Sequence, residues 1–124
     1  MSIAHVGVTL DCADLQQVAA FWSAALDLDP DFEGEYALLR GRGTRSGLQG
    51  FTLQRVPEAK TVKNRMHFDL VTPDVEPEVQ RLIGLGATVL SREVEPTAEE
   101  TVVMADPEGN EFCVIKEHAA ATDG

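Results

Sequence analysis

The chain has 124 residues and a formal net charge of −11, with 44% hydrophobic and 25% charged residues. This length and composition are typical of one soluble globular domain with a real hydrophobic core. The negative charge argues against nucleic acid and anionic membrane surfaces as partners, and no apolar run approaches the roughly 20 residues that cross a bilayer.

The first half of the chain begins with an alternating segment, IAHVGVTL at 3–10, which predicts a strand with one apolar and one mixed face. A helix is expected over DLQQVAAFWSAALDLD at 14–29, with Asp14 as its N-cap and Trp22 on its apolar, core-facing side. Two further strand-like segments follow, EYALLR at 35–40 and GLQGFTLQRV at 47–56.

The second half repeats this order of elements. The segment RMHFDLV at 65–71 alternates like a strand, and DVEPEVQRLIGLGA at 74–87 predicts a helix that is capped by Asp74 and ends at Gly86. Its apolar stripe consists of Val75, Val79, Leu82 and Ile83. Three strand-like segments follow, at 87–94, 100–106 and 110–117.

The repeat predicts a single domain over 1–124 that consists of two modules of the order strand–helix–strand–strand–strand. Its parts are module one at about 3–56, a linker at 57–64, module two at about 65–117 and a short tail at 118–124. Each module has one helix to cover one face of its sheet, so the other faces must close on a partner half and would enclose a cleft. The mixed strand faces would line this cleft with His5, Gly7, Thr52, Gln54, His67, Asp69, Glu111 and Cys113.

Three stretches carry a resemblance to a known family: LDCADLQQVAAFWSAALDLDP, LQRVPEAKTVKNRMHFDL and VVMADPEGNEFCVIKE. They resemble the vicinal oxygen chelate superfamily of glyoxalase I, bleomycin-resistance proteins, fosfomycin-resistance enzymes and extradiol dioxygenases, and in particular its glyoxalase-like branch. The resemblance implies an α+β fold in which two tandem βαβββ modules form curved mixed sheets around a cleft. It also implies a homodimer.

The resemblance further implies one divalent metal, Zn, Ni, Mn or Fe, held by residues of the first and last strand of each module. His67 matches a histidine ligand of the family, whereas Gly7 stands at the equivalent first-module position and His5 lies two residues earlier on the same face. Gln54 and Cys113 occupy strands on which the family usually has glutamate. We therefore expect no metal cofactor; if a metal binds, the candidate ligands are His67, His5, Cys113 and Gln54.

Several of these residues also have plain structural interpretations. Cys113 is typical of a small buried side chain, and Glu111 is expected to bond the backbone of the preceding turn or to meet solvent. The DPEG sequence at 106–109 is itself a turn signal. The region from Arg40 to Arg65 contains seven of the ten basic residues, which could either steer a small anion or be solvated loop charges.

These observations predict a protein that binds a small organic molecule, anionic or aromatic, in the cleft between its modules. One alternative is a metal-dependent lyase, isomerase or dioxygenase with an atypical His/Cys/Gln site, and another is a metal-free catalyst with His67 as its base, assisted by His5 or Glu111. A third is a dimeric interaction module without a ligand, which the polar residues on the inner strand faces argue against. The sequence leaves open whether the protein is an enzyme and whether the cleft forms within one chain or between two. Cys12 and Cys113 form no metal or redox motif, and with no signal peptide the chain is expected in the cytoplasm.

Overall fold

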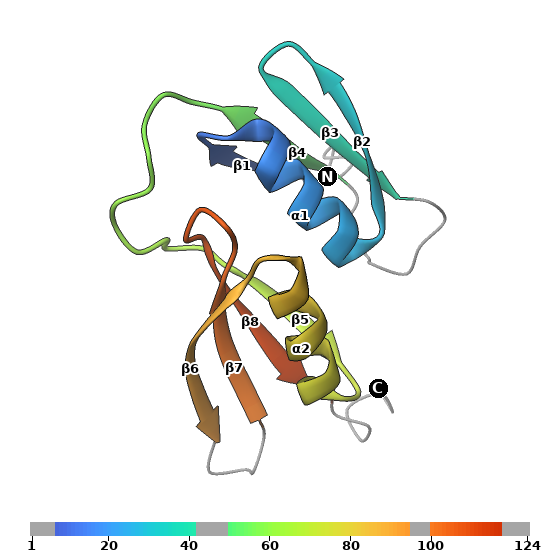
Figure 1. The fold of residues 1–124 in the computed structure, drawn as a ribbon, viewed down its shortest axis with the longest axis vertical. Coiled ribbons are helices and arrows are strands. Elements are labelled where there is room, and N and C mark those ends of the chain that lie inside the picture. Colours follow the sequence, from blue (N-terminus) through green and yellow to red (C-terminus); the bar gives the residue numbers. More distant parts are fainter. Residues whose placement is uncertain (1–6, 42–49, 95–99, 118–124) are drawn as a thin grey trace, which may run out of the picture. The chain divides into compact units, whose positions relative to one another are not determined.

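The computed structural model describes residues 7–41, 50–94 and 100–117, and it divides the chain into two compact units. Unit 1 is Met1–Thr61 and unit 2 is Val62–Gly124, so the boundary lies inside the predicted linker 57–64. Each unit combines one helix with one four-stranded sheet of mixed direction (Figure 1). This confirms the predicted α+β fold with two βαβββ modules.

Unit 1 follows the strand–helix–strand–strand–strand order. Its elements are β1 Val8–Cys12, α1 Leu15–Leu26, β2 Leu28–Glu33, β3 Tyr36–Gly41 and β4 Phe51–Arg55. The sheet order is β1-β4-β3-β2, in which β1 and β4 run parallel and the other pairs are antiparallel. The parallel pair places the first and last strands of the unit side by side.

Helix α1 begins as predicted at Asp14, whose carboxylate accepts a hydrogen bond from the Gln17 amide at 3.1 Å. Trp22 is 1% exposed, which confirms its predicted place in the core. Its ring packs edge-to-face on Phe21 and Phe51, with ring centroids 5.0 and 5.9 Å apart. The contact between Trp22 and Phe51 thus joins the helix to its sheet, beside the buried aliphatic side chains of the helix.

The predicted helix over 14–29 was too long, and the strand after it was missed. α1 ends at Leu26, because Asp27 takes a left-handed conformation and its amide donates to the Ser23 carbonyl. Pro30 could not have continued the helix, but it is tolerated in β2, which is an edge strand of its sheet.

Unit 2 repeats the architecture with different packing. Its elements are β5 Phe68–Thr72, α2 Val75–Leu85, β6 Thr88–Val94, β7 Glu100–Ala105 and β8 Glu111–Lys116. The sheet order is β5-β8-β7-β6, and β5 and β8 again run parallel. α2 ends at Gly86 in a left-handed conformation, as predicted, while Asp74 occupies the N-cap position without a side-chain capping bond.

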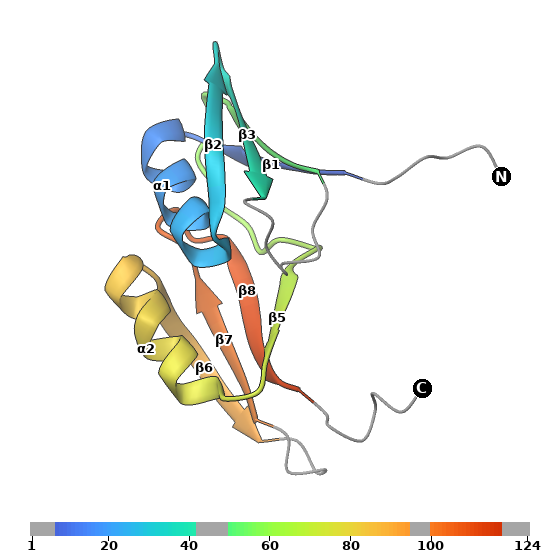
Figure 2. The same cartoon turned by 90° about the vertical axis from the view of Figure 1, so that its right-hand side faces the viewer.

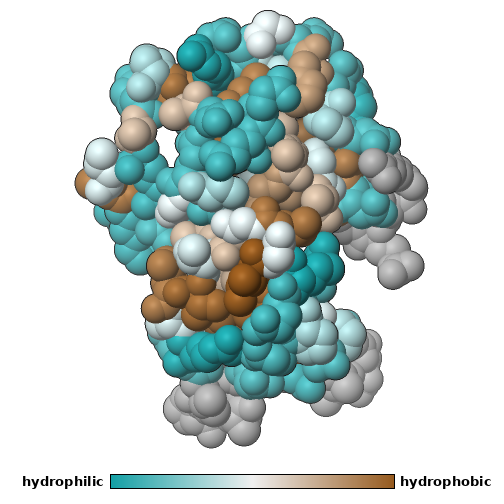
Figure 3. Space-filling model, in the orientation of Figure 1, coloured by the Kyte–Doolittle hydropathy of each residue, from teal (hydrophilic) through white to brown (hydrophobic). Residues whose placement is uncertain are grey.

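The apolar stripe predicted for α2 is only partly buried. Val75, Val79 and Leu82 are at most 1% exposed, but Ile83 is 39% exposed. Leu90 of β6 is also exposed, and Figure 3 shows hydrophobic residues gathered on the surface of unit 2 over α2 and β6. Ile83 therefore belongs to the surface of unit 2 and not to its core.

In each unit the helix covers one face of its own sheet, as Figure 2 shows. The opposite face carries the alternate strand residues: Thr9 lies beside Thr52 in unit 1, and Asp69 beside Cys113 in unit 2. We call these the open faces. The predicted division into apolar and mixed strand faces is confirmed at these positions, although residues 1–6, 42–49, 95–99 and 118–124 lie outside the described structure.

No helix in the described ranges is both long and apolar enough to cross a membrane. α1 and α2, the two helices described, have 12 and 11 residues.

Candidate functional site

Three of the predicted site residues come together on the open face of unit 2. His67 directly precedes β5, Asp69 lies within it, and the parallel register places Asp69 beside Cys113 of β8. One ligand atom from each side chain lies within 4.8 Å of the other two. The Nδ1 atom of His67 is 3.2 Å from Oδ1 of Asp69. We call this group the His67–Asp69–Cys113 trio.

The trio is accessible to small molecules. The side chains of His67 and Asp69 are 39% and 50% exposed, and Cys113 is half-buried. Burial raises the pKa of the Cys113 thiol, the negative charges of Asp69 and Glu93 raise it further, and Lys63 partly opposes them. Because the thiolate is the reactive form, Cys113 is a weak nucleophile near neutral pH.

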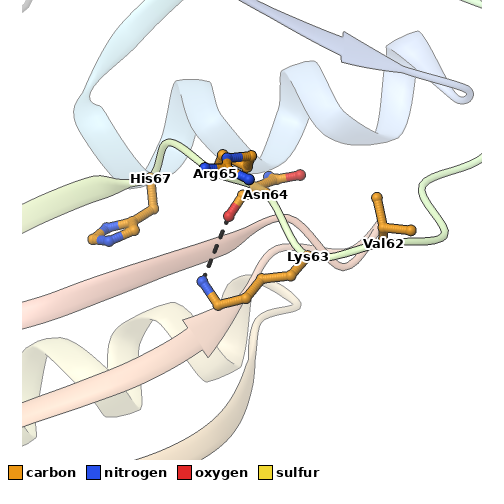
Figure 4. A pocket seen from close by; sticks show the side chains of 5 residues that line it. All are labelled: Val62, Lys63, Asn64, Arg65 and His67. Atoms are coloured by element: carbon orange, nitrogen blue, oxygen red, sulfur yellow. Dashed lines mark hydrogen bonds between the residues drawn. The ribbon is translucent and has the colours of Figure 1, made fainter.

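A hollow of about 590 Å³ adjoins the trio and shares His67 with it (Figure 4). The segment before β5 lines it with Val62, Lys63, Asn64, Arg65 and His67. Lys63 and Arg65 bring two positive charges to this short segment in a protein whose net charge is −11. The hollow therefore offers a locally cationic surface.

Glu111 and Asn110 hold that segment in place. The Asn64 amide donates to Oε1 of Glu111 at 3.0 Å, and the Asn64 side-chain amide donates to Oδ1 of Asn110 at 3.1 Å. Glu111 thus bonds the backbone of the segment before β5. Its proposed part as a catalytic assistant stays a prediction.

The start of β8 is positioned by a turn that the sequence marked only as DPEG. Asp106 is 3% exposed, and its Oδ1 accepts hydrogen bonds from the amides of Glu108 and Asn110, both at 2.9 Å. The Asn110 side chain donates to both carboxylate oxygens of Asp106, and Gly109 adopts a positive φ of 89°. Sequence reasoning missed Asp106, Asn110 and Asn64 as positioning residues, although the Asp and Asn that flank the Pro-Glu-Gly segment were a usable signal.

The first-module candidates that the structure describes lie on unit 1 and form no comparable group. Thr52 and Gln54 pair with Thr9 and Asp11 across the parallel strands, and Gly7 is exposed just before β1. A Cβ atom at Gly7 would lie 3.3 Å from the Gly50 carbonyl oxygen, so the position favours close backbone approach. His5 lies outside the described residues.

Among the described residues, the trio is the one set of three metal-capable side chains whose ligand atoms lie within 4.8 Å of one another. Its imidazole, carboxylate and thiol fit a divalent cation of the zinc type, whereas the neutral amide of Gln54 is a weaker ligand on the other unit. The residues present therefore fit a metal, but with a donor set different from the His and Glu set that the family resemblance implies.

The family model described as "Glyoxalase-like domain" matches residues 7–115. The chain belongs to the glyoxalase-like domain family. This places it in the glyoxalase/bleomycin resistance/dioxygenase superfamily, also called the vicinal oxygen chelate superfamily, and confirms the resemblance drawn from the sequence. No curated protein matches this glyoxalase-like chain.

Solved structures share the fold at low sequence identity. A genomically encoded fosfomycin resistance protein from Listeria monocytogenes has a TM-score of 0.75 at 13% identity, covering 97% of this chain and 98% of that one. A glyoxalase-related enzyme from Fulvimarina pelagi has a TM-score of 0.69 at 20% identity, with 93% and 89% covered. A lactoylglutathione lyase from Agrobacterium tumefaciens has a TM-score of 0.64 at 19% identity, with 94% and 96% covered. These likenesses establish the glyoxalase-like fold and leave the activity open.

Proposed function

We propose that this glyoxalase-like protein binds a small organic anion at the open face of unit 2, without the His and Glu metal set implied by the resemblance. The observation that carries the proposal is the cationic hollow beside the trio. Its volume of about 590 Å³ falls within the range of roughly 300–1,000 Å³ that small-molecule sites occupy. The proposal needs only unit 2, and the predicted cleft between the modules stays a prediction.

The charge distribution supports an anion over a neutral ligand. Lys63, Arg65 and the half-exposed His67 line one hollow, and each can donate a hydrogen bond to a carboxylate or phosphate. Val62 is 74% exposed and adds apolar surface at the same hollow. A ligand with an anionic head and an apolar or aromatic body matches both features.

A matched pair of probes tests this function. Benzoate and its neutral analogue benzamide share shape and size, so a cationic site separates them by charge alone. We expect benzoate to shift the amide NMR signals of residues 62–67, benzamide to bind more weakly, and added salt to weaken benzoate binding. Equal binding of the two probes would sink the anion proposal.

Two variants locate the site. Lys63→Ala and Arg65→Ala should each weaken benzoate binding by up to about 5-fold, which is the range of one exposed charge interaction. Lys116→Ala is the control, because Lys116 is an exposed lysine at the end of β8 and does not line the hollow. A loss in the control as large as in the other variants would mean nonspecific attraction.

A second candidate function, a divalent-metal-dependent lyase, isomerase or dioxygenase, is favoured by the trio itself. A bound metal would supply Lewis-acid chemistry, polarising an oxygen of the substrate. His67, Asp69 and Cys113 would hold it, while Lys63 and Arg65 would bind the anionic part of the substrate. The homodimer and the cytoplasmic location also stay predictions.

A further inference from the structure

We propose that unit 2 by itself binds a thiophilic divalent cation, with Zn²⁺ as the best fit, through the His67 imidazole, the Asp69 carboxylate and the Cys113 thiolate. The inference goes beyond organic-anion binding, because it assigns a metal site with a donor set of its own. On binding, the Cys113 thiol loses its proton to solvent and its sulfur forms the bond to the metal.

The backbone already places the three donors together. The parallel register fixes Asp69 beside Cys113. His67 lies two residues before Asp69, a spacing that directs both side chains to the same face of an extended chain. Their ligand atoms lie within 4.8 Å of one another, and the His67 and Asp69 atoms are already 3.2 Å apart. Tetrahedral zinc, with bonds of about 2.0–2.3 Å, needs donors about 3.5 Å apart. These partly exposed side chains would have to rotate to close the difference.

The donor chemistry selects the metal. A thiolate and an imidazole favour zinc or cobalt, whereas magnesium, calcium and manganese prefer sets of oxygen ligands. One thiolate and one carboxylate would balance the charge of a divalent cation. Glu93 adds negative potential at Cys113 and Lys63 opposes it. The selection of the metal therefore rests on the donor atoms and not on these nearby charges. Three protein ligands leave a fourth position for water or for an anionic ligand.

Two carboxylates lie close to Cys113, and their hydrogen bonds favour Asp69 over Glu111 as the metal ligand. Glu111 lies on the same strand face as Cys113, two residues away, but its carboxylate accepts the Asn64 amide at 3.0 Å. Asp69 instead lies on the adjacent strand, directly beside Cys113. The carboxylate that completes the site therefore comes from β5, and not from β8.

Cobalt spectroscopy on the full chain tests the site without any activity assay. Protein freed of metal by a chelator is titrated with Co²⁺, and we expect one equivalent to produce a thiolate-to-cobalt charge-transfer band together with intense tetrahedral d–d bands. Zn²⁺ should displace Co²⁺ and abolish the bands. Wild-type protein that shows no charge-transfer band up to saturating Co²⁺ would overturn the proposal.

Variants assign the ligands by competition with a chromogenic chelator. Cys113→Ser should remove the charge-transfer band, and Cys113→Ser and Asp69→Asn should each weaken Zn²⁺ binding by about 100-fold or more, because even outer-shell changes cost about 10–100-fold. Asp74→Asn is the control, since Asp74 is an exposed acid of unit 2 whose side chain makes no capping bond. It should leave Zn²⁺ affinity unchanged.

The predicted first-module ligands provide the decisive contrast. His5→Ala and Gln54→Ala should leave both the cobalt band and the zinc affinity as in the wild type. A loss in either variant as large as in Cys113→Ser would refute a site made by unit 2 alone. Benzoate binding by metal-free protein is measured separately, so failure of the metal site and failure of anion binding give different results.

Discussion

The two units share one architecture but differ in the chemistry of their open faces. In unit 1 the parallel pair β1 and β4 presents Thr9 beside Thr52 and Asp11 beside Gln54. In unit 2 the equivalent pair β5 and β8 presents Asp69 beside Cys113, with His67 next to them. A repeated βαβββ module therefore repeats the scaffold without repeating the site, because strand pairing sets positions and leaves side-chain identity free.

Their cores differ as well. α1 packs through Trp22 and Phe21, whereas α2 buries only aliphatic residues and has no aromatic side chain. Unit 2 buries Phe112 of β8 and has a hydrogen-bonded turn around Asp106. We therefore expect a large contribution to stability from the Trp22 contact in unit 1 and from the polar turn in unit 2, and this contrast can be tested.

The largest expected effect is in the core of unit 1. Trp22→Ala removes a side chain that is 1% exposed and should lower the free energy of unfolding by about 3–5 kcal/mol. Urea unfolding measures this loss. Phe32→Ala is the aromatic control in the same unit, since Phe32 is 41% exposed, and its effect should stay within about 0.5 kcal/mol. Similar losses in the free energy of unfolding in both variants would show that unit 1 does not depend on the buried Trp22 contact.

The turn of unit 2 should come next. Asp106→Ala leaves the amides of Glu108 and Asn110 and the Asn110 side chain without their shared acceptor. The free energy of unfolding should fall by about 3 kcal/mol, since buried donors that lose a charged partner are costly. Glu117→Ala, at an exposed position just after β8, should change little. If Asp106→Ala is as stable as the wild type, the turn does not stabilise unit 2.

The two thiols provide a smaller, kinetic test, run with a chelator present. Cys12 is 2% exposed and its thiol contacts the Gln54 carbonyl oxygen, so iodoacetamide should modify only Cys113 in the folded protein. Because the pKa of Cys113 is raised, its thiolate fraction at pH 8 is below that of a free peptide thiol, and the rate should be slower and rise at higher pH.

Asp69→Asn should speed this alkylation by only a few-fold, because burial, and not Asp69, is the largest cause of the raised pKa. Mass spectrometry after digestion assigns the modified cysteine. Faster modification of Cys12 than of Cys113, or a slower reaction in Asp69→Asn, would contradict the described surroundings of Cys113.

The smallest effect is expected on the surface of unit 2. The Arg92 guanidinium lies 2.7 Å from Oε1 of Glu76, and this hydrogen bond is the main cause that lowers the Glu76 pKa. A carboxylate whose pKa is lowered by folding stabilises the folded state at pH values above its ordinary pKa. This stabilisation is lost as the pH falls through the lowered pKa. Both groups are exposed, so we expect a change in pKa without a resolvable change in stability.

Carboxyl NMR titration measures this pKa. Arg92→Ala should return the Glu76 pKa toward its ordinary value. Arg81→Ala is the matched control, because Arg81 pairs with Glu78 and should leave Glu76 unchanged. An unchanged Glu76 pKa in Arg92→Ala would show that the ion pair between α2 and β6 does not form in solution.

Much of the fold was readable from local patterns. The alternation of residues predicted which side chains share a strand face, and Asp14 and Gly86 marked a start and an end of helices. The prediction failed where local signals conflict: LDPDFE at 28–33 has neither clear alternation nor helical spacing, and only its pairing with β3 makes it a strand. Ile83 likewise continued the apolar stripe of the sequence, but in the structure its side chain lies on the exposed side of α2.

The sequence by itself determined the repeated module, the family and the strand face on which Asp69, Glu111 and Cys113 lie, because alternation and capping are local properties of the chain. Only the tertiary structure decided which of these residues meet. The register of β5 and β8 brings Asp69 to Cys113, and the path of the segment before β5 brings Asn64 to Glu111. Such contacts join residues more than forty positions apart, and no local pattern specifies the register that aligns them.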